Sequence, residues 1–508
     1  MKKPTLRWVG IQLGLWVYVG AVAVGLIFLL KDDRVSAVIA GLVFAGVILF
    51  SKYVLGFGFL SAPMLFLAGL GLFHLGLVVP WALGLYDTSE VWWFRREELG
   101  PPLGLVTLAF LGLQLGVIVG LRRRIVGGGN QNGTRARFLQ DGPLFWGGLI
   151  LLAVGLIAYS AGLYQIFGWD FFSYAYGETF SVLRQADTRL IYFGVLVVPI
   201  GIYLAIAGAS PTRLRVVLVL IAIWGMWQLF AGVRSRAFIV GLMALYLLAK
   251  KGVRLPRVSY PVMIALALVI IPAVQIMRSE VASRRLQLQA LTLRDLNPLN
   301  GIAEMGRSIW PLVGTYRLAE TDGHRHGRTY LYTLSKVVPG LPSLVYSGER
   351  LSSVTDELLP SRWFVAATQP EVARLNLGPA FSAVAEAYLN FGFPGVGVIF
   401  FALGYFLVYL EQMRLKNPYV LAAQATILGP VLWSVRSDSY ALGRPIVWGL
   451  AYILVVWLVF VRSRRGAPMV AGSRASSRGP GLGPARSALP GQATCGRSGS
   501  STVPAQSD

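Results

Sequence analysis

Seven arginines lie at or near the ends of apolar segments, where they could bind an anion. A guanidinium stays charged, and its planar fork suits bidentate binding of phosphate or carboxylate. Arg278 and Arg285 share one helical face if the preceding helix continues. Contacts with lipid headgroups and ion pairs such as Glu280–Arg284 are the alternative explanation. Because such arginines occur at four separate helix ends, we favour an anionic ligand; the seven are Arg234, Arg236, Arg278, Arg284, Arg285, Arg436 and Arg444.

The composition places these arginines in a membrane protein. The chain has 508 residues, of which 55% are hydrophobic and only 14% are charged. A soluble domain could not solvate this composition, so the predicted fold class is an all-α polytopic membrane protein. About twelve apolar windows of roughly 16–24 residues fit a hydrocarbon core about 30 Å thick. The net charge of +23 is explained by basic loops between helices, which argues against nucleic acid as a partner.

The predicted helices divide the chain into four regions. Residues 1–277 contain nine spans, and residues 393–462 contain three. Between them, residues 278–392 form one long polar loop in which acidic and basic side chains nearly balance. Residues 463–508 are rich in Gly, Pro, Ser and Arg, which predicts a disordered basic tail. The expected spans are 8–30, 35–50, 61–85, 103–121, 144–164, 190–207, 216–232, 237–249, 260–277, 393–410, 419–435 and 446–461.

Loop charges predict which side of the membrane each loop occupies. Alternate loops carry only Lys and Arg in their charged clusters, and both termini are also basic. The positive-inside rule therefore places this face and both termini in the cytoplasm. The long loop of residues 278–392 is then expected outside. The basic clusters lie at 122–137, 213–215, 250–257 and 414–416.

The three histidines and the single cysteine do not predict a metal site. Cys495 is alone, so a disulfide framework is excluded. His324 and His326 lie in a segment typical of an exposed turn, and no third ligand follows at a useful spacing. His74 lies within an apolar span, where a hydrogen bond to a neighbouring helix explains it better than catalysis does.

Several short motifs resemble the Wzy-type O-antigen polymerases, the oligosaccharide repeat unit polymerases. The most specific of them reads Glu-Ala-Tyr-Leu-Asn-Phe-Gly at 386–392, and another reads Glu-Met-Gly-Arg-Ser at 304–308. The resemblance covers roughly residues 185–460. It implies a GT-C-like glycosyltransferase with a helical membrane core, an outward-facing site, a lipid-linked donor and no cofactor. The other similar segments are 232–236, 327–331 with 338–340, and 433–438.

The reaction that the resemblance implies is polymerisation of lipid-linked repeat units. A growing glycan passes from undecaprenyl pyrophosphate to a new repeat unit at the outer face of the bacterial inner membrane, in O-antigen or exopolysaccharide synthesis. Charge develops on the departing pyrophosphate, so positioned cations should contribute most to catalysis. The candidate pyrophosphate ligands are Arg234, Arg236, Arg278, Arg285 and Arg436.

A carboxylate is expected to accept the proton of the acceptor hydroxyl, and Glu386 and Glu304 are the two candidates. For Glu386 a structural role stays open. Its motif could end a helix, with Gly392 as the cap and the carboxylate bonded to an arginine. Trp310 could stack on a sugar ring or anchor the membrane interface. Residues of the same motifs that are expected to bind substrate are Arg307, Ser308, Tyr388 and Asn390.

Two other functions share these features. An O-antigen ligase would use the same type of donor, but the expected histidine beside an asparagine in the outer loop is absent from the sequence. A non-enzymatic flippase for lipid-linked oligosaccharides should show repeated halves and charges deep within spans. The implied partners are undecaprenyl-pyrophosphate-linked oligosaccharides, the lipid bilayer, and flippase and chain-length regulator proteins.

Overall fold

Every regular element that the structure describes is a helix, which confirms the predicted all-α class. Residues 1–462 form one compact unit and residues 463–508 a second, of which only the end of the last helix is described. The predicted disordered tail therefore lies almost wholly outside the described residues. The computed structural model describes residues 6–89, 91–94, 98–126, 142–169, 182–183, 186, 188–231, 233–253, 297–338, 340–341, 357–374, 380–413 and 417–466.

Eight of the described helices are long and apolar enough to cross a membrane. Three shorter ones also coincide with predicted spans: α3 (Ala62–Leu75), α10 (Arg234–Lys250) and α21 (Pro418–Ser434). The expected span 260–277 lies outside the described residues, so about twelve spans and a GT-C-like arrangement stay predictions. The eight are α1 (Leu6–Leu30), α2 (Asp33–Leu49) with the π-helical turn η1 (Phe50–Val54), α5 (Gly100–Val126), α6 (Gly142–Phe167), α8 (Arg189–Gly208), α9 (Pro211–Phe230), α20 (Ala383–Gln412) and α22 (Tyr440–Gly466).

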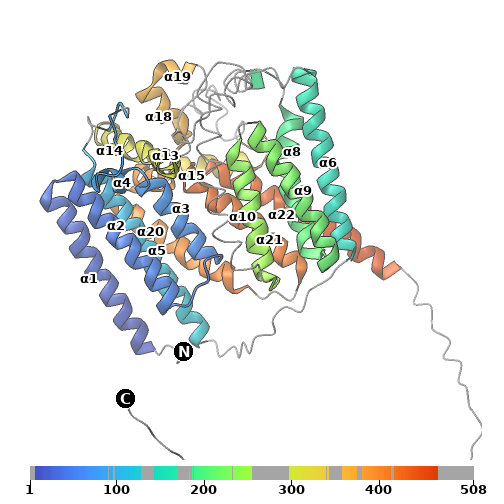
Figure 1. The fold of residues 1–508 in the computed structure, drawn as a ribbon, viewed down its shortest axis with the longest axis horizontal. Helices are drawn as coiled ribbons and strands as arrows, with labels where there is room; N and C mark the ends of the chain where they lie inside the picture. The colour runs from blue at the N-terminus through green and yellow to red at the C-terminus, as the bar shows by residue number, and fades with distance from the viewer. Residues whose placement is uncertain are drawn as a thin grey trace, which may run out of the picture. The chain divides into compact units, whose positions relative to one another are not determined.

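Short helices gather at one end of the bundle, opposite the end where α1 begins (Figure 1). Most of them come from the long polar interval between α10 and α20. We call this end the loop end and the opposite end the basic end. The short helices are α4 (Val78–Ala82), α13 (Pro298–Gly306), the 3₁₀ turn η3 (Arg307–Ile309), α14 (Trp310–Asp322), α15 (Arg328–Val337), α18 (Pro360–Thr368) and α19 (Pro370–Arg374).

The span expected at 393–410 follows a break in α20 at Gly392, where φ is +66°. The helix before the break begins at Ala383, because the Ser382 hydroxyl caps it by accepting the backbone N–H of Val384 at 3.2 Å. One expected boundary was wrong. The span expected at 61–85 is interrupted, since α3 ends at Leu75 and only the short α4 follows.

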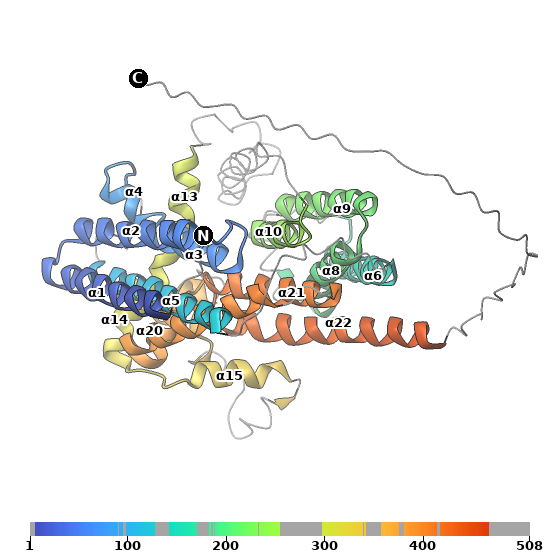
Figure 2. The same ribbon diagram turned by 90° about the horizontal axis from the view of Figure 1, so that it is seen from below.

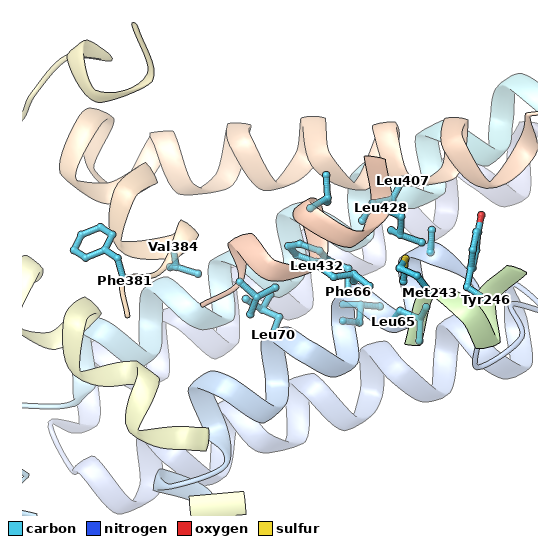
Figure 3. Packing of buried hydrophobic residues seen from close by; sticks show 14 of the residues in the cluster. Leu65, Phe66, Leu70, Met243, Tyr246, Phe381, Val384, Leu407, Leu428 and Leu432 are labelled. Atoms are coloured by element: carbon cyan, nitrogen blue, oxygen red, sulfur yellow. The ribbon is translucent and has the colours of Figure 1, made fainter. Parts of the chain in front are cut away.

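Close backbone contacts at glycines hold the long helices together. A methyl group on Gly112 of α5 would lie 2.7 Å from the carbonyl oxygen of Gly397 in α20. Gly148 and Gly201 make α6 and α8 approach each other in the same way. Small residues at contacts of this kind are typical of helices packed within a membrane. Larger apolar side chains fill the region where α3, α10, α20 and α21 meet (Figure 3), among them Phe66, Leu70, Met243, Leu407, Leu428 and Leu432.

Candidate functional site

The loop end contains a bidentate ion pair between two predicted site residues. Both terminal nitrogens of Arg234 donate to the Glu304 carboxylate, with 2.5 Å between Nη1 and Oε2. The Arg234 side chain is 4% exposed and that of Glu304 is 16% exposed. Arg234 begins α10, and Glu304 lies near the end of α13, 70 residues later in the chain. The structure thus joins a predicted pyrophosphate ligand to a predicted base.

The break between α3 and α4 positions Glu304. Gly306 packs its Cα directly on the backbone of Gly76 and Leu77, where any side chain would collide with main-chain atoms. In return, a methyl group on Gly76 would lie 2.7 Å from the carbonyl oxygen of Ile302. The two glycines therefore allow α13 to rest on the end of α3. This contact explains both the interrupted span and the glycine in the Glu-Met-Gly-Arg-Ser motif.

Three other predicted residues lie near this contact. Arg307 follows Gly306 in η3; it is half-buried, and its Nε has no hydrogen-bond partner within the described structure. Ser308 is buried beside it. Arg436 follows α21 and lies over the ring of Phe73 in α3, with 5.6 Å between Cζ and the ring centre. Arg436 and the η3 turn that carries Arg307 thus both lie against α3, on whose end the Glu304 helix α13 also rests.

Arg236 lies on a different side of α10 from Arg234. It lies two residues beyond Arg234 on α10, and residues with this spacing face different sides of a helix. Its side chain is half-buried. Arg278 and Arg285, the remaining predicted pyrophosphate ligands, lie outside the described residues. The predicted set of five is therefore only partly placed.

Glu386 lies in a second, fully buried cluster. Glu386 is only 1% exposed. Its carboxylate accepts hydrogen bonds from the Thr329 hydroxyl at 2.8 Å and from the Ser439 hydroxyl at 2.7 Å. The backbone N–H of Ser439 donates a third bond at 2.6 Å. The carboxylate thus ties α20 to α15 and to the turn before α22. The expected arginine partner was wrong, since hydroxyl and amide groups satisfy this carboxylate.

Asn390 and Tyr388 also have structural contacts. The Asn390 side-chain nitrogen donates to the Thr329 hydroxyl at 2.7 Å, and its oxygen accepts the backbone N–H of Gly327 at 2.9 Å. Tyr388 stacks on Tyr316 of α14, with 5.4 Å between ring centres. The motif from Glu386 to Gly392 therefore builds a helix end to which the turn before α15 is attached. We call Glu386, Asn390, Thr329 and Ser439 the Glu386 cluster.

Sequence reasoning missed Asp438, Ser439 and Thr329. All three lie in or beside segments similar to the family signatures, so their positions were a usable signal. Asp438 is buried and accepts the backbone N–H of Ser361 at 3.3 Å. Burial raises the pKa of Asp438 above its ordinary value. The turn between α21 and α22 therefore contacts α3 through Arg436 and the Glu386 cluster through Ser439.

The histidines and Trp310 take part in packing. His74 hydrogen-bonds to the Leu70 carbonyl at 3.0 Å and to the Ser382 hydroxyl at 2.7 Å, as predicted for a histidine satisfied by a neighbouring helix. His324 packs edge-on against Tyr388. Trp310 is buried and stacked on Trp93, which leaves no open face for a sugar ring. Among the described residues no three His, Cys, Asp or Glu form a metal-sized group, and the absence of a metal stays a prediction.

Comparison with known proteins gave one finding. The chain matches the family described as O-antigen polysaccharide polymerase Wzy over residues 15–464. The match includes both the Arg234–Glu304 pair and the Glu386 cluster. No curated protein and no solved structure matches the chain.

Proposed function

The chain belongs to the O-antigen polysaccharide polymerase Wzy family, and from this premise we propose that it joins lipid-linked oligosaccharide repeat units into a polymer. The growing glycan passes from undecaprenyl pyrophosphate to a new lipid-linked repeat unit. The site faces the periplasm from the bacterial inner membrane, and both termini lie in the cytoplasm. The observation that supports this best is the buried Arg234–Glu304 pair at the loop end.

Arg234 lies in the first turn of α10, where the helix dipole is positive. A cation and a helix N-terminus together form a site for an anion, and the Glu304 carboxylate occupies this site in the structure. The carboxylate of Glu304 stands in for a ligand phosphate. When a pyrophosphate binds Arg234, Glu304 loses its partner and becomes available to accept a proton.

The transfer of the glycan needs no reactant other than the two lipid-linked substrates. The bond between the anomeric carbon and the pyrophosphate oxygen breaks, and undecaprenyl pyrophosphate leaves with the electron pair. The acceptor hydroxyl oxygen forms the new bond to the anomeric carbon and transfers its proton to Glu304. Arg234, Arg307 and Arg436 stabilise the negative charge that develops on the leaving group. Arg236, Arg278 and Arg285 remain proposed as additional phosphate contacts on the motif resemblance alone.

Glu304 is the better base of the two candidates. Its carboxylate is partly exposed and has one exchangeable partner. The carboxylate of Glu386 is buried and already accepts three hydrogen bonds from groups of the protein itself. We assign Glu386 and Asn390 to positioning of the site, and Ser308 and Tyr388 to its lining. A flippase and chain-length regulators are proposed as partners on the family membership alone.

The test is polymer formation by purified protein from synthetic lipid-linked repeat units. Glu304→Gln keeps the shape of the side chain but removes its basicity, so turnover should fall by about 100-fold or more. Glu411→Gln is the matched control, because Glu411 is also paired with a cation, Lys250, but at the basic end. It should retain the activity of the wild type.

Three outcomes would overturn this proposal. Near-normal polymerisation by Glu304→Gln would remove Glu304 as the base. Wild-type protein that transfers single glycans to a lipid A core, without polymer, would be a ligase. Movement of lipid-linked oligosaccharide across vesicles without any new glycosidic bond would indicate a flippase.

A further inference from the structure

Helix α15 turns hydroxyl side chains and Tyr332 toward the protein, and turns a row of apolar side chains outward beyond the exposed Arg328 of its first turn. Thr329, Thr333 and Ser335 are buried, whereas Leu331 and Leu334 are each 64% exposed. Val338, directly after the helix, is 52% exposed. These three apolar residues follow the spacing i, i+3 and i+7, so they form one continuous face. A helix surrounded by water would present the opposite arrangement.

The inward side is satisfied by specific hydrogen bonds. Thr329 donates to Glu386, and the Thr333 hydroxyl lies 2.9 Å from the Ser439 hydroxyl. A rotation that buried the leucines would break both contacts and leave buried polar groups unpaired, at a cost of roughly 1–3 kcal/mol each. The outward position of Leu331 and Leu334 is therefore required by the rest of the fold.

Contacts with α22 place α15 beside a membrane-spanning helix. The Arg444 Nε donates to the Lys336 carbonyl at 2.9 Å, and the Trp448 indole donates to the Val337 carbonyl at 3.3 Å. Gly443 permits this approach, since a methyl group there would lie 2.7 Å from the Val337 side chain. Figure 2 shows α15 at the edge of the helices, beside α20 and α22.

The level of these contacts along α22 indicates what surrounds α15. Trp448 lies eight residues after the first residue of α22, which is about 12 Å along a helix axis. The apolar span of α22 covers 21 residues, about 31 Å, close to the thickness of a hydrocarbon core. The end of α15 thus lies beside the apolar span of α22, inward of the start of that span. Exposed apolar side chains of α22, including Val447, lie at the same level.

From these contacts we propose that α15 is embedded in the lipid bilayer at the loop end, with Leu331, Leu334 and Val338 in the hydrocarbon. A helix can enter this layer because its backbone groups are bonded internally. Lys336 and Arg444 border the apolar face, and their long side chains can reach the phosphate groups of lipids. This proposal concerns the membrane contact and does not depend on the reaction proposed above.

An environment-sensitive fluorophore on a single cysteine tests the proposal. The one native cysteine is replaced in the full chain (Cys495→Ser), Leu334→Cys is introduced and labelled, and the protein is placed in phosphatidylcholine nanodiscs. We expect blue-shifted emission that is quenched by lipids brominated high on the acyl chain. Leu454→Cys on α22 is the lipid-exposed control, and Glu371→Cys on α19 is the water-exposed control.

Two results would overturn the proposal. Emission like that of the Glu371→Cys control would place the leucine face in water. Blue-shifted emission that brominated lipids do not quench would mean that protein covers this face. Leu331→Cys is measured in parallel, so that failure of one labelled variant to fold does not decide the outcome.

Discussion

Both ends of the helix bundle concentrate cations, but the cations have different partners. At the basic end, Lys251 donates to three carbonyls at the C-terminal end of α8, at 2.8 to 3.0 Å. Lys250 pairs with Glu411, whose other oxygen accepts the N–H of Ala62 at the start of α3. These charges close helix ends, where they complement the helix dipoles. At the loop end, Arg234 sits at the wrong end of its helix for that purpose.

The difference shows which charges need a functional explanation. A lysine bonded to helix carbonyls is accounted for by the fold. A buried arginine at a helix N-terminus, held by a carboxylate from a separate loop helix, is not stabilised by its own helix. Positive charge alone therefore does not indicate a ligand site. A buried cation at a helix N-terminus does indicate one, because the helix dipole does not stabilise it there.

The loop end and the basic end should lie on opposite sides of the membrane. Glu371→Cys at the loop end should react with an impermeant maleimide in intact cells, in a chain whose native cysteine is replaced. Thr212→Cys, exposed at the start of α9 near the basic end, should react only after the membrane is opened. Labelling of Thr212→Cys in intact cells would contradict the proposed sidedness.

Exchanging the charges of the loop-end pair separates stability from chemistry. Arg234→Glu alone leaves two carboxylates together, and we expect a loss of roughly 3–5 kcal/mol of unfolding free energy. Adding Glu304→Arg restores the pair and much of the melting temperature. Polymer formation should stay at least about 100-fold below wild type, because the cation has left the α10 N-terminus.

The matched change at the basic end is Lys250→Met, which should lower the melting temperature but leave the activity per folded molecule unchanged. Polymerisation restored together with stability in the exchanged loop-end pair would reduce that pair to a structural role. The two ends would then not differ in function.

Glu386→Gln tests the division between the Arg234–Glu304 pair and the Glu386 cluster. One carboxylate oxygen accepts from the hydroxyls of Thr329 and Ser439, and the other accepts from the Ser439 backbone N–H. The NH₂ group of glutamine cannot accept a hydrogen bond in place of either oxygen, so we expect a loss of about 1–3 kcal/mol. Activity should fall only in proportion to the folded fraction, measured by melting temperature and polymer yield. A stable, substrate-binding but inactive variant would instead identify Glu386 as the base.

Much of the fold could be predicted from local sequence. Apolar runs identified the long helices, and Gly392, considered in the sequence as the cap of a helix end, is where α20 breaks. The pairing of Arg234 with Glu304 could not be predicted, because it joins segments 70 residues apart and depends on a glycine contact between α13 and the end of α3. The helix boundary near residue 76 was missed for a related reason: a tertiary contact at Gly76 interrupts an apolar run that the hydropathy pattern shows as continuous.

Sequence motifs identified residues that the structure brings together, but not the hydrogen bonds that each residue makes. The motif around Glu386 drew attention by its specificity, but its side chains are mostly consumed by hydrogen bonds that hold helices together. Asp438 and Ser439 lay beside a recognised segment and were overlooked, since a single Asp or Ser after an arginine has no distinctive spacing. The two faces of α15 were not predicted from the sequence, and the tertiary contacts of Thr329 and Thr333 determine which face is outward.

The smallest expected effect concerns Asp438, the buried acid that lies close enough to Glu386 for the two carboxylates to repel each other. Burial raises the pKa of Asp438, so the folded chain holds this proton more tightly than the unfolded chain does. The contribution of this proton to the free energy of unfolding is complete below the ordinary pKa of 3.8 and is lost as the pH rises through the pKa of the folded chain.

Asp438→Asn stays neutral, so its melting temperature relative to wild type should rise between pH 4 and pH 8, by roughly 2 °C per kcal/mol. Asp322→Asn, which removes an exposed acid at the same end, is the control for the general effect of losing one acidic group. A difference that is independent of pH would mean that Asp438 is ionised in the fold throughout this range, and the turn between α21 and α22 would then carry a permanent negative charge beside Arg436.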